Sequence, residues 1–199
     1  MDMVLRKWIG ILAIMCAGGI LTGCQTTQNT PPAQMFTADS FKPLALNARR
    51  LEIIDNWQMP VTDPYVGHRA RPLPSNVLAE WATHILQPAG GSGELVFDIG
   101  KAAVKMEPLA MKAGLDGLFT DQQSQQITAE IEANIMWLQP VGGRNARIEL
   151  QASHGVTVPE SATPAQVLNA IHEAVQGALR RIDGEARREL ARIDRIILP

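Results

Sequence analysis

The sequence predicts an α/β (α+β) fold: a two-layer sandwich in which about four strands form a mixed sheet and two helices cover one face, in the order β-α-β-β-β-α. Residues 94–106, 127–138 and 145–156 alternate between apolar and polar side chains, which is typical of strands with one buried face. Residues 75–86 and 164–197 instead carry apolar residues at three- and four-residue steps. Because the apolar face of the sheet needs cover, we expect both helices to lie on it.

The predicted fold begins with one strand and one helix. Residues 44–56 contain a short alternation around Leu51 and Ile53 and are predicted to form one strand. The helix over 75–86 follows a proline-rich entry and takes Ser75 as its N-cap. A strand, a helix and a strand in this order predict a right-handed parallel crossover, and the later strands an antiparallel meander.

Glycines mark two features of that meander. The apolar phase of residues 94–106 changes by one position after Gly100, as a β-bulge would produce. Gly142 and Gly143 predict a hairpin turn between the next two strands. Pairing Trp137 with Ala146 across this turn keeps every apolar side chain on one face.

The final helix is predicted over residues 164–197. Thr163 and Gln166 form a capping box, with Pro164 at the first helical position. A helix of this length measures about 51 Å, against about 40 Å for a twelve-residue strand, which predicts an overhang. Its apolar face comprises Val167, Leu168, Ile171, Val175, Ala178, Leu179, Ile182, Ala186, Leu190 and Ile193. Its distal polar face is either solvated or a partner surface and carries Arg187, Arg188, Glu189, Arg192 and Arg195.

The N-terminal segment has the features of an export signal. Arg6 and Lys7 precede an uncharged run over 8–21, whose length as a helix is about 21 Å, short of the roughly 30 Å core of a bilayer. The run ends in Leu21-Thr22-Gly23-Cys24, which resembles the lipobox of bacterial lipoprotein signal peptides. The alternative is an ordinary signal with an incidental cysteine.

The lipobox resemblance implies a location and a domain organisation. It implies that diacylglycerol alkylates the Cys24 thiol and that cleavage leaves Cys24 as the new N-terminus. Gln25 stands where an aspartate favours inner-membrane retention in that family, which implies the inner leaflet of the outer membrane, with the domain facing the periplasm. We therefore expect a signal peptide over 1–23, a lipidated flexible tether over 24–40 and a single periplasmic sandwich domain over 41–199.

Composition argues against several function classes. The formal net charge is −2, and removal of residues 1–23 makes it −3. Because binding to phosphates needs a basic surface, we expect no nucleic-acid partner. The four histidines show no metal-ligand spacing, and no cofactor-binding motif is present, so we expect neither metal nor cofactor. Glu130 and Glu132 could form an acid/base pair of a hydrolase, but a solvated strand face is the expected reading. We therefore expect no enzymatic activity.

Two long connections carry the candidate partner-binding residues, because loops of this length in compact domains are usually functional. Residues 55–74 contribute Trp57, Tyr65, His68, Arg69 and Arg71, and Trp, Tyr and Arg are the residue types that dominate interface hot spots. The alternative is a proline-stiffened crossover whose aromatic residues pack on the sheet edge.

The second connection spans residues 107–124 and is unusually apolar for a loop. It contributes Met111, Leu115, Leu118 and Phe119 as further candidate partner-binding residues. These side chains either plug the end of the sandwich or offer a docking surface.

Together, the lipobox, the polar tether and the predicted sandwich look like the auxiliary lipoproteins of bacterial ABC-type and lipid-transport systems. This resemblance implies a non-catalytic accessory or scaffold subunit of a cell-envelope complex, with a protein partner. The alternative is a periplasmic ligand-binding module with a small apolar pocket between sheet and helices, for which the inner face offers small residues. These are Ala129, Ala133, Ala146 and Ala152, which could equally let the helices pack closely.

Overall fold

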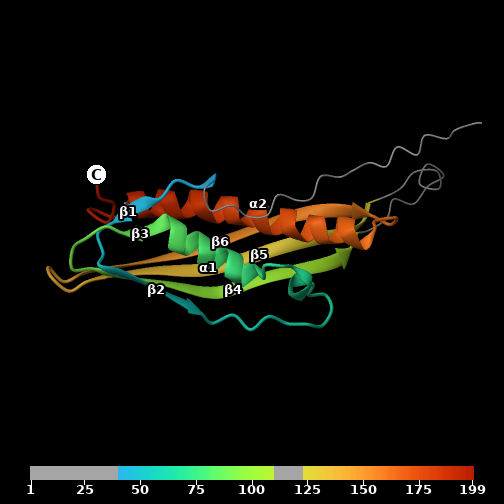
Figure 1. Cartoon of the computed structure of the whole chain (residues 1–199), viewed down its shortest axis with the longest axis horizontal. Helices are drawn as coiled ribbons and strands as arrows, with labels where there is room; N and C mark the ends of the chain where they lie inside the picture. Colours follow the sequence, from blue (N-terminus) through green and yellow to red (C-terminus); the bar gives the residue numbers. More distant parts are fainter. Residues whose placement is uncertain (1–39, 110–122) are drawn as a thin grey trace, which may run out of the picture.

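A computed structural model of the chain describes residues 40–109 and 123–199. In chain order, the helices and strands are β1 (Leu44–Leu46), β2 (Arg50–Asp55), η2 (Gly67–Arg69), α1 (Pro74–Ile85), β3 (Leu86–Pro88), β4 (Glu94–Pro108), β5 (Gln123–Gln139), β6 (Arg144–Pro159) and α2 (Pro164–Ala191). A four-stranded mixed sheet carries both α-helices on one face (Figure 1). This arrangement confirms the predicted α/β sandwich. None of the described helices is long and apolar enough to cross a bilayer.

The main sheet has the order β2-β4-β5-β6 and matches the predicted register. β2 runs parallel to β4, and β4, β5 and β6 form an antiparallel meander. Trp137 pairs with Ala146, as the alternation requires. The pairing of β4 with β5 shifts between Ile99 and Lys101, which confirms the bulge predicted at Gly100.

The predicted first strand is right only in part: β2 forms around Leu51 and Ile53 as predicted, but residues 44–46 form a separate strand in a second sheet. β1 pairs in parallel with β3, a short strand that the sequence analysis did not predict, and only β2 joins the main sheet. The C-terminal segment lies on the other side of β1: Ile197 bridges Leu46, and the Leu198 N–H donates to the Ala45 carbonyl over 2.8 Å. Residues 44–46 therefore form a strand because of their tertiary pairing and not because of a local alternation.

The helix boundaries correct two further predictions. α1 begins at Pro74 after Leu73, with no side-chain cap, so Ser75 is not its N-cap. α2 has the predicted capping box, in which Gln166 N–H donates to Thr163 Oγ1 and Thr163 N–H donates to Gln166 Oε1. Its 28 residues end at Ala191, so it measures about 42 Å against about 58 Å for the 17 residues of β5. The helix is shorter than the sheet, and the predicted overhang is wrong.

Large aromatic residues join the two helices to the sheet. Trp81 of α1 is fully buried, and its ring lies 5.7 Å from that of Phe97 in β4. The Trp81 indole N–H also donates to Asp183 of α2 over 3.2 Å. Trp81 therefore fixes α1 against both the sheet and α2. Of the predicted apolar face of α2, Leu168 is the exception, with 36% of its surface exposed.

Two glycines in α2 have different surroundings. A Cβ atom at Gly177 would lie 2.0 Å from the His154 ring of β6, so this glycine is required by close packing of helix and sheet. At Gly184 the nearest atom to an added Cβ is Nη1 of Arg188, at 3.5 Å, which is ordinary contact with a flexible side chain. No close neighbour therefore requires a glycine at position 184.

We predict that the same substitution at these two positions changes stability in opposite directions. Gly177→Ala should lower the free energy of unfolding by about 1–3 kcal/mol, because the methyl group collides with the His154 ring. Gly184→Ala should raise it by up to about 1 kcal/mol, because alanine favours the helix. Denaturant unfolding followed by circular dichroism measures both. The double variant His154→Ala/Gly177→Ala is the control, since it removes the collision; equal effects at 177 and 184 would contradict the packing described here.

Candidate functional site

The crossover between β2 and α1, residues 56–73, lies along the edge of β4. β2 pairs with β4 only as far as Ile99. Beyond Ile99, the crossover pairs with the same edge of β4. The Val66 N–H donates to the Val104 carbonyl and the Met106 N–H donates to the Pro64 carbonyl, both over 2.8 Å. This edge of the sheet is therefore covered by backbone hydrogen bonds beyond the end of β2.

The five predicted crossover residues have different environments. Trp57 is half-buried against the core, and its indole N–H is buried without a partner among the described residues. His68 is half-buried as well, with Nδ1 similarly unpartnered within the described part of the chain. Arg69 and Arg71 are both exposed, and Arg71 also donates to the carbonyls of His68 and Ala70. The crossover thus presents the two arginines to solvent and holds Trp57, Tyr65 and His68 closer to the fold.

Tyr65 connects the crossover to a charge network on the outer face of the sheet. Lys105 Nζ lies 5.9 Å from the centre of the Tyr65 ring and 2.9 Å from Glu130 Oε1. The other oxygen of Glu130 is 2.7 Å from Lys101 Nζ. Ala103 lies between the two lysines on β4 and is only 2% exposed. Glu130 therefore bridges two strand lysines above a buried alanine.

The protonation of this network argues against acid/base chemistry. The hydrogen bond from Lys101 lowers the pKa of Glu130, and the same bond raises the pKa of Lys101. Glu132 is paired with Lys101 as well, over 3.2 Å, and its side chain is 49% exposed. Both carboxylates are thus ion-pair partners of lysine. Among the described residues, no group of three His, Cys, Asp or Glu side chains could hold a metal ion.

Several predicted positions lie outside the described residues. These are the lipidation residue and the apolar residues of the second connection, namely Cys24, Met111, Leu115, Leu118 and Phe119. Of the second connection, residues 107 and 108 belong to β4 and residues 123 and 124 to β5.

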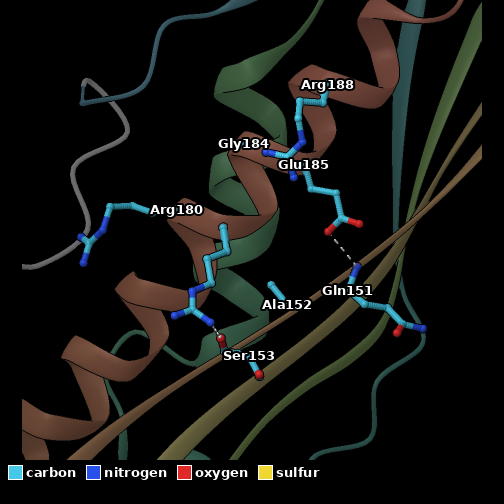
Figure 2. A pocket seen from close by; sticks show the side chains of 8 residues that line it. Gln151, Ala152, Ser153, Arg180, Gly184, Glu185 and Arg188 are labelled. Atoms are coloured by element: carbon cyan, nitrogen blue, oxygen red, sulfur yellow. Dashed lines mark hydrogen bonds between the residues drawn. The ribbon is translucent and has the colours of Figure 1, made fainter.

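A polar hollow lies between α2 and the outer edge of β6, and we call it the arginine groove. It has a volume of about 490 Å³ and is lined by Gln151, Ala152 and Ser153 of β6 and by Arg180, Arg181, Gly184, Glu185 and Arg188 of α2 (Figure 2). Glu185 accepts a hydrogen bond from the Gln151 N–H over 3.3 Å, and Arg181 donates to the Ser153 carbonyl over 2.6 Å. Side chains of the helix thus bond the backbone edge of the strand.

The sequence contained a signal for half of this groove. Arg180, Gly184 and Arg188 are four residues apart and share one stripe of the helix. Of these, only Arg188 belongs to the distal polar face predicted from the sequence. The facing strand residues lie about 30 positions earlier, so only the tertiary structure shows that helix and strand form one groove.

The four inner-face alanines are part of the packed core or border it. Ala129 and Ala133 are buried, and Ala146 and Ala152 pack against the core. Ala152 also lines the arginine groove, whose other walls are mostly charged or polar. At these positions the small side chains let the helices approach the sheet.

A second, smaller hollow lies at the β5–β6 hairpin. It measures about 290 Å³ and is lined by Asn47, Trp137, Gln139, Val141, Gly142, Arg144 and Arg195. Arg195 has a left-handed backbone, with φ at 62°, and its carbonyl accepts a hydrogen bond from Asn47. Arg144 and Arg195 share Asp194, each at 3.5 Å.

We predict that Glu130→Gln lowers stability at neutral pH by about 1 kcal/mol, because it removes a carboxylate held by two lysines. Since the pKa of Glu130 is lowered in the folded state, its contribution exists above the ordinary carboxyl pKa of about 4.3 and is lost as the pH falls through the folded value. The difference between variant and wild type should therefore shrink in acid. Unfolding curves between neutral and acidic pH measure it.

Glu132→Gln is the matched control for this prediction. Its carboxylate makes a single, more exposed contact with Lys101, so its effect at neutral pH should be smaller. Equal effects of the two substitutions, or a difference that persists unchanged in acid, would contradict the assigned role of Glu130.

Comparison with known proteins gives distant structural neighbours. No protein-family model matches the sequence, and no curated protein sequence matches it. The chain is similar to protein XCC0632 from Xanthomonas campestris, of the family model DUF330, at 14% identity, with 73% of this chain and 91% of that chain covered and a TM-score of 0.34. It is similar to rare lipoprotein B from Shewanella oneidensis at 11% identity, with 71% and 96% covered and a TM-score of 0.34.

A third neighbour is PelC from Paraburkholderia phytofirmans, at 12% identity, with 72% of this chain and 94% of that chain covered and a TM-score of 0.25. Identities and TM-scores this low do not assign a family or a function to the chain.

Proposed function

We propose that the protein is a lipid-anchored lipoprotein of the bacterial cell envelope that acts as a non-catalytic accessory or scaffold subunit, in a complex of the lipid-transport or ABC-type kind. The observation that carries this proposal is the sequence Leu21-Thr22-Gly23-Cys24 at the end of an uncharged run too short to span a bilayer. A cysteine in this position is the acceptor for diacylglycerol.

The anchor accounts for the proposed location. A single acyl chain binds a membrane only marginally, whereas two or more chains hold a protein stably. Gln25 after the cysteine directs the protein to the inner leaflet of the outer membrane, where the domain faces the periplasm. The polar residues 25–40 then act as a tether, which as a flexible chain spans on the order of 20 Å.

The accessory role rests on the surfaces that the sandwich offers. The described pair of outer-face carboxylates is neutralised by lysines, which suits a structural role. The crossover holds Trp57 and Tyr65 against the fold and leaves Arg69 exposed, an arrangement that presents a preorganised surface to a partner protein. We include His68 and Arg71 in this surface; the apolar residues of the second connection stay candidate partner-binding residues and lie outside the described residues.

We predict that Cys24→Ser abolishes lipidation, because serine lacks the thiol that is alkylated. The variant should keep its signal peptide and lose the mass of the acyl chains, which mass spectrometry of the N-terminal peptide measures. Cys16→Ser is the matched control, since Cys16 lies within the uncharged run, and it should be lipidated like the wild type. A normally processed, freely soluble Cys24→Ser protein, with no lipid on the wild type, would refute the proposal.

We predict that the crossover contacts the partner protein. A photo-crosslinking amino acid in place of Arg69 should give a reproducible crosslinked species in intact membranes, because this side chain is exposed on the proposed surface. The same amino acid in place of Glu52, which is exposed on β2, is the control and should give little. Equal crosslinking at both positions, or at neither, would argue against the crossover as the contact surface.

A further inference from the structure

The two long edges of the main sheet are protected differently. The β4 edge is covered by β2 and then by backbone hydrogen bonds from residues 64–66. β6 is a 16-residue strand with β5 on one side and no strand on the other among the described residues. Unpaired backbone groups on an edge strand are a template for another strand. On β6 they are bonded by helix side chains at Gln151 and Ser153.

These two side-chain bonds imitate a neighbouring strand. Glu185 supplies an acceptor to the Gln151 N–H, and Arg181 supplies a donor to the Ser153 carbonyl, as the backbone of an adjacent strand would (Figure 2). Both bonds come from long side chains that can swing away. A strand that entered the groove would replace them with backbone hydrogen bonds and lose none of the satisfied groups on β6.

The groove also carries uncompensated positive charge. It holds three arginines and one glutamate, and within the described part of the chain Arg180 and Arg188 form no ion pair or hydrogen bond. Figure 2 shows Arg188 lying beside Gly184 and Arg180 extending from the helix away from β6, at the rim of the groove. Arginine presents a planar set of donors that binds both oxygens of one carboxylate. The charge of the groove therefore favours an acidic occupant.

Gly184 gives that occupant room. A glycine inside a helix is less favourable than an alanine, and no close neighbour requires it at this position. Gly184 lines the hollow between helix and strand. Gly177, by contrast, is required by the His154 ring. Position 184 is thus a place where the helix gives up stability and where only the flexible Arg188 side chain lies close by.

We propose that the arginine groove binds an acidic, extended segment of a partner protein, which adds as a strand to the outer edge of β6 and places its carboxylates on Arg180 and Arg188. The sheet edge supplies the backbone pairing and the arginines supply the preference for acidic side chains. A second copy of this chain is disfavoured as the occupant, because two grooves facing each other would bring like charges together.

This inference deepens the proposed function. It rests on that function because the partner is taken to be an envelope protein. The binding test uses the purified full-length protein in nonionic detergent and reads neither lipidation nor location. Its failure would leave the lipid anchor standing, and failure of lipidation would leave peptide binding measurable. The two outcomes are therefore separable.

The probe is a fluorescein-labelled peptide of eight residues in which glutamate alternates with threonine, so that one face of the strand is acidic. Anisotropy measures its Kd. One control peptide has glutamine in place of glutamate, and a second keeps the glutamates but carries N-methyl groups on alternate backbone nitrogens, which prevents strand pairing. The glutamate peptide should bind most tightly of the three. In the Glu185→Ala variant the Gln151 N–H has lost its acceptor within the protein, so the bound glutamate peptide should slow hydrogen exchange of this amide relative to the free variant.

Variants separate the groove from general electrostatics. Arg180→Gln/Arg188→Gln should raise the Kd about tenfold, because two charge-assisted contacts are lost. Arg49→Gln/Arg50→Gln removes the same charge at exposed arginines at the start of β2, outside the groove, and should leave the Kd unchanged. Gly184→Leu should weaken binding while it raises the melting temperature, a combination that an unfolded variant cannot produce.

The proposal is overturned if the glutamate and glutamine peptides bind equally or not at all, or if the N-methylated peptide binds as well as its parent. It is also overturned if the two double variants behave alike. Vesicles containing phosphatidylglycerol provide the last comparison: binding to them that depends on Arg180 and Arg188, without binding of the peptide, would assign the groove to a lipid surface instead.

Discussion

The apolar inner face of β5 is the constraint on which the rest of the structure depends. Every second residue from Ile127 to Trp137 is buried, so this face of the sheet must be covered along its whole length. β4 and β6 extend the same face on either side, and α1 and α2 close it. Small residues at 129 and 133, and Gly177 against His154, allow α2 to come close to the sheet. Once this layer is packed, the inner face is fully used for stability.

Binding surfaces are consequently left to the edges and ends of the sheet. The crossover seals one edge with backbone hydrogen bonds and keeps Arg69 exposed, whereas α2 guards the opposite edge with Arg181 and Glu185. One helix thus serves two purposes: its apolar face stabilises the core and its polar flank controls access to β6. A single change of helix orientation would affect both, which ties the proposed interactions to the packing of the domain.

The sequence predicted those parts of the structure that depend on periodicity. Alternation fixes which face of β4, β5 and β6 is buried, so the pairing of Trp137 with Ala146 followed from the pattern. Ser75 and the single first strand failed because both were inferred from short local signals, while pairing with β3 and the C-terminus decides the structure there. The arginine groove could not be predicted, since its two walls are distant in the sequence. The lipobox could be recognised because its residues are contiguous.

The pairing of β1 with the segment around Ile197 has a consequence for the order of folding. Leu46 and Ile197 are far apart in the sequence, yet they form a bridge in the structure. Closing so long a loop costs conformational entropy, which makes contacts between distant segments slow to form. We therefore expect β1 to gain this neighbour late in folding, after α2 has packed on the sheet and brought the segment beside it.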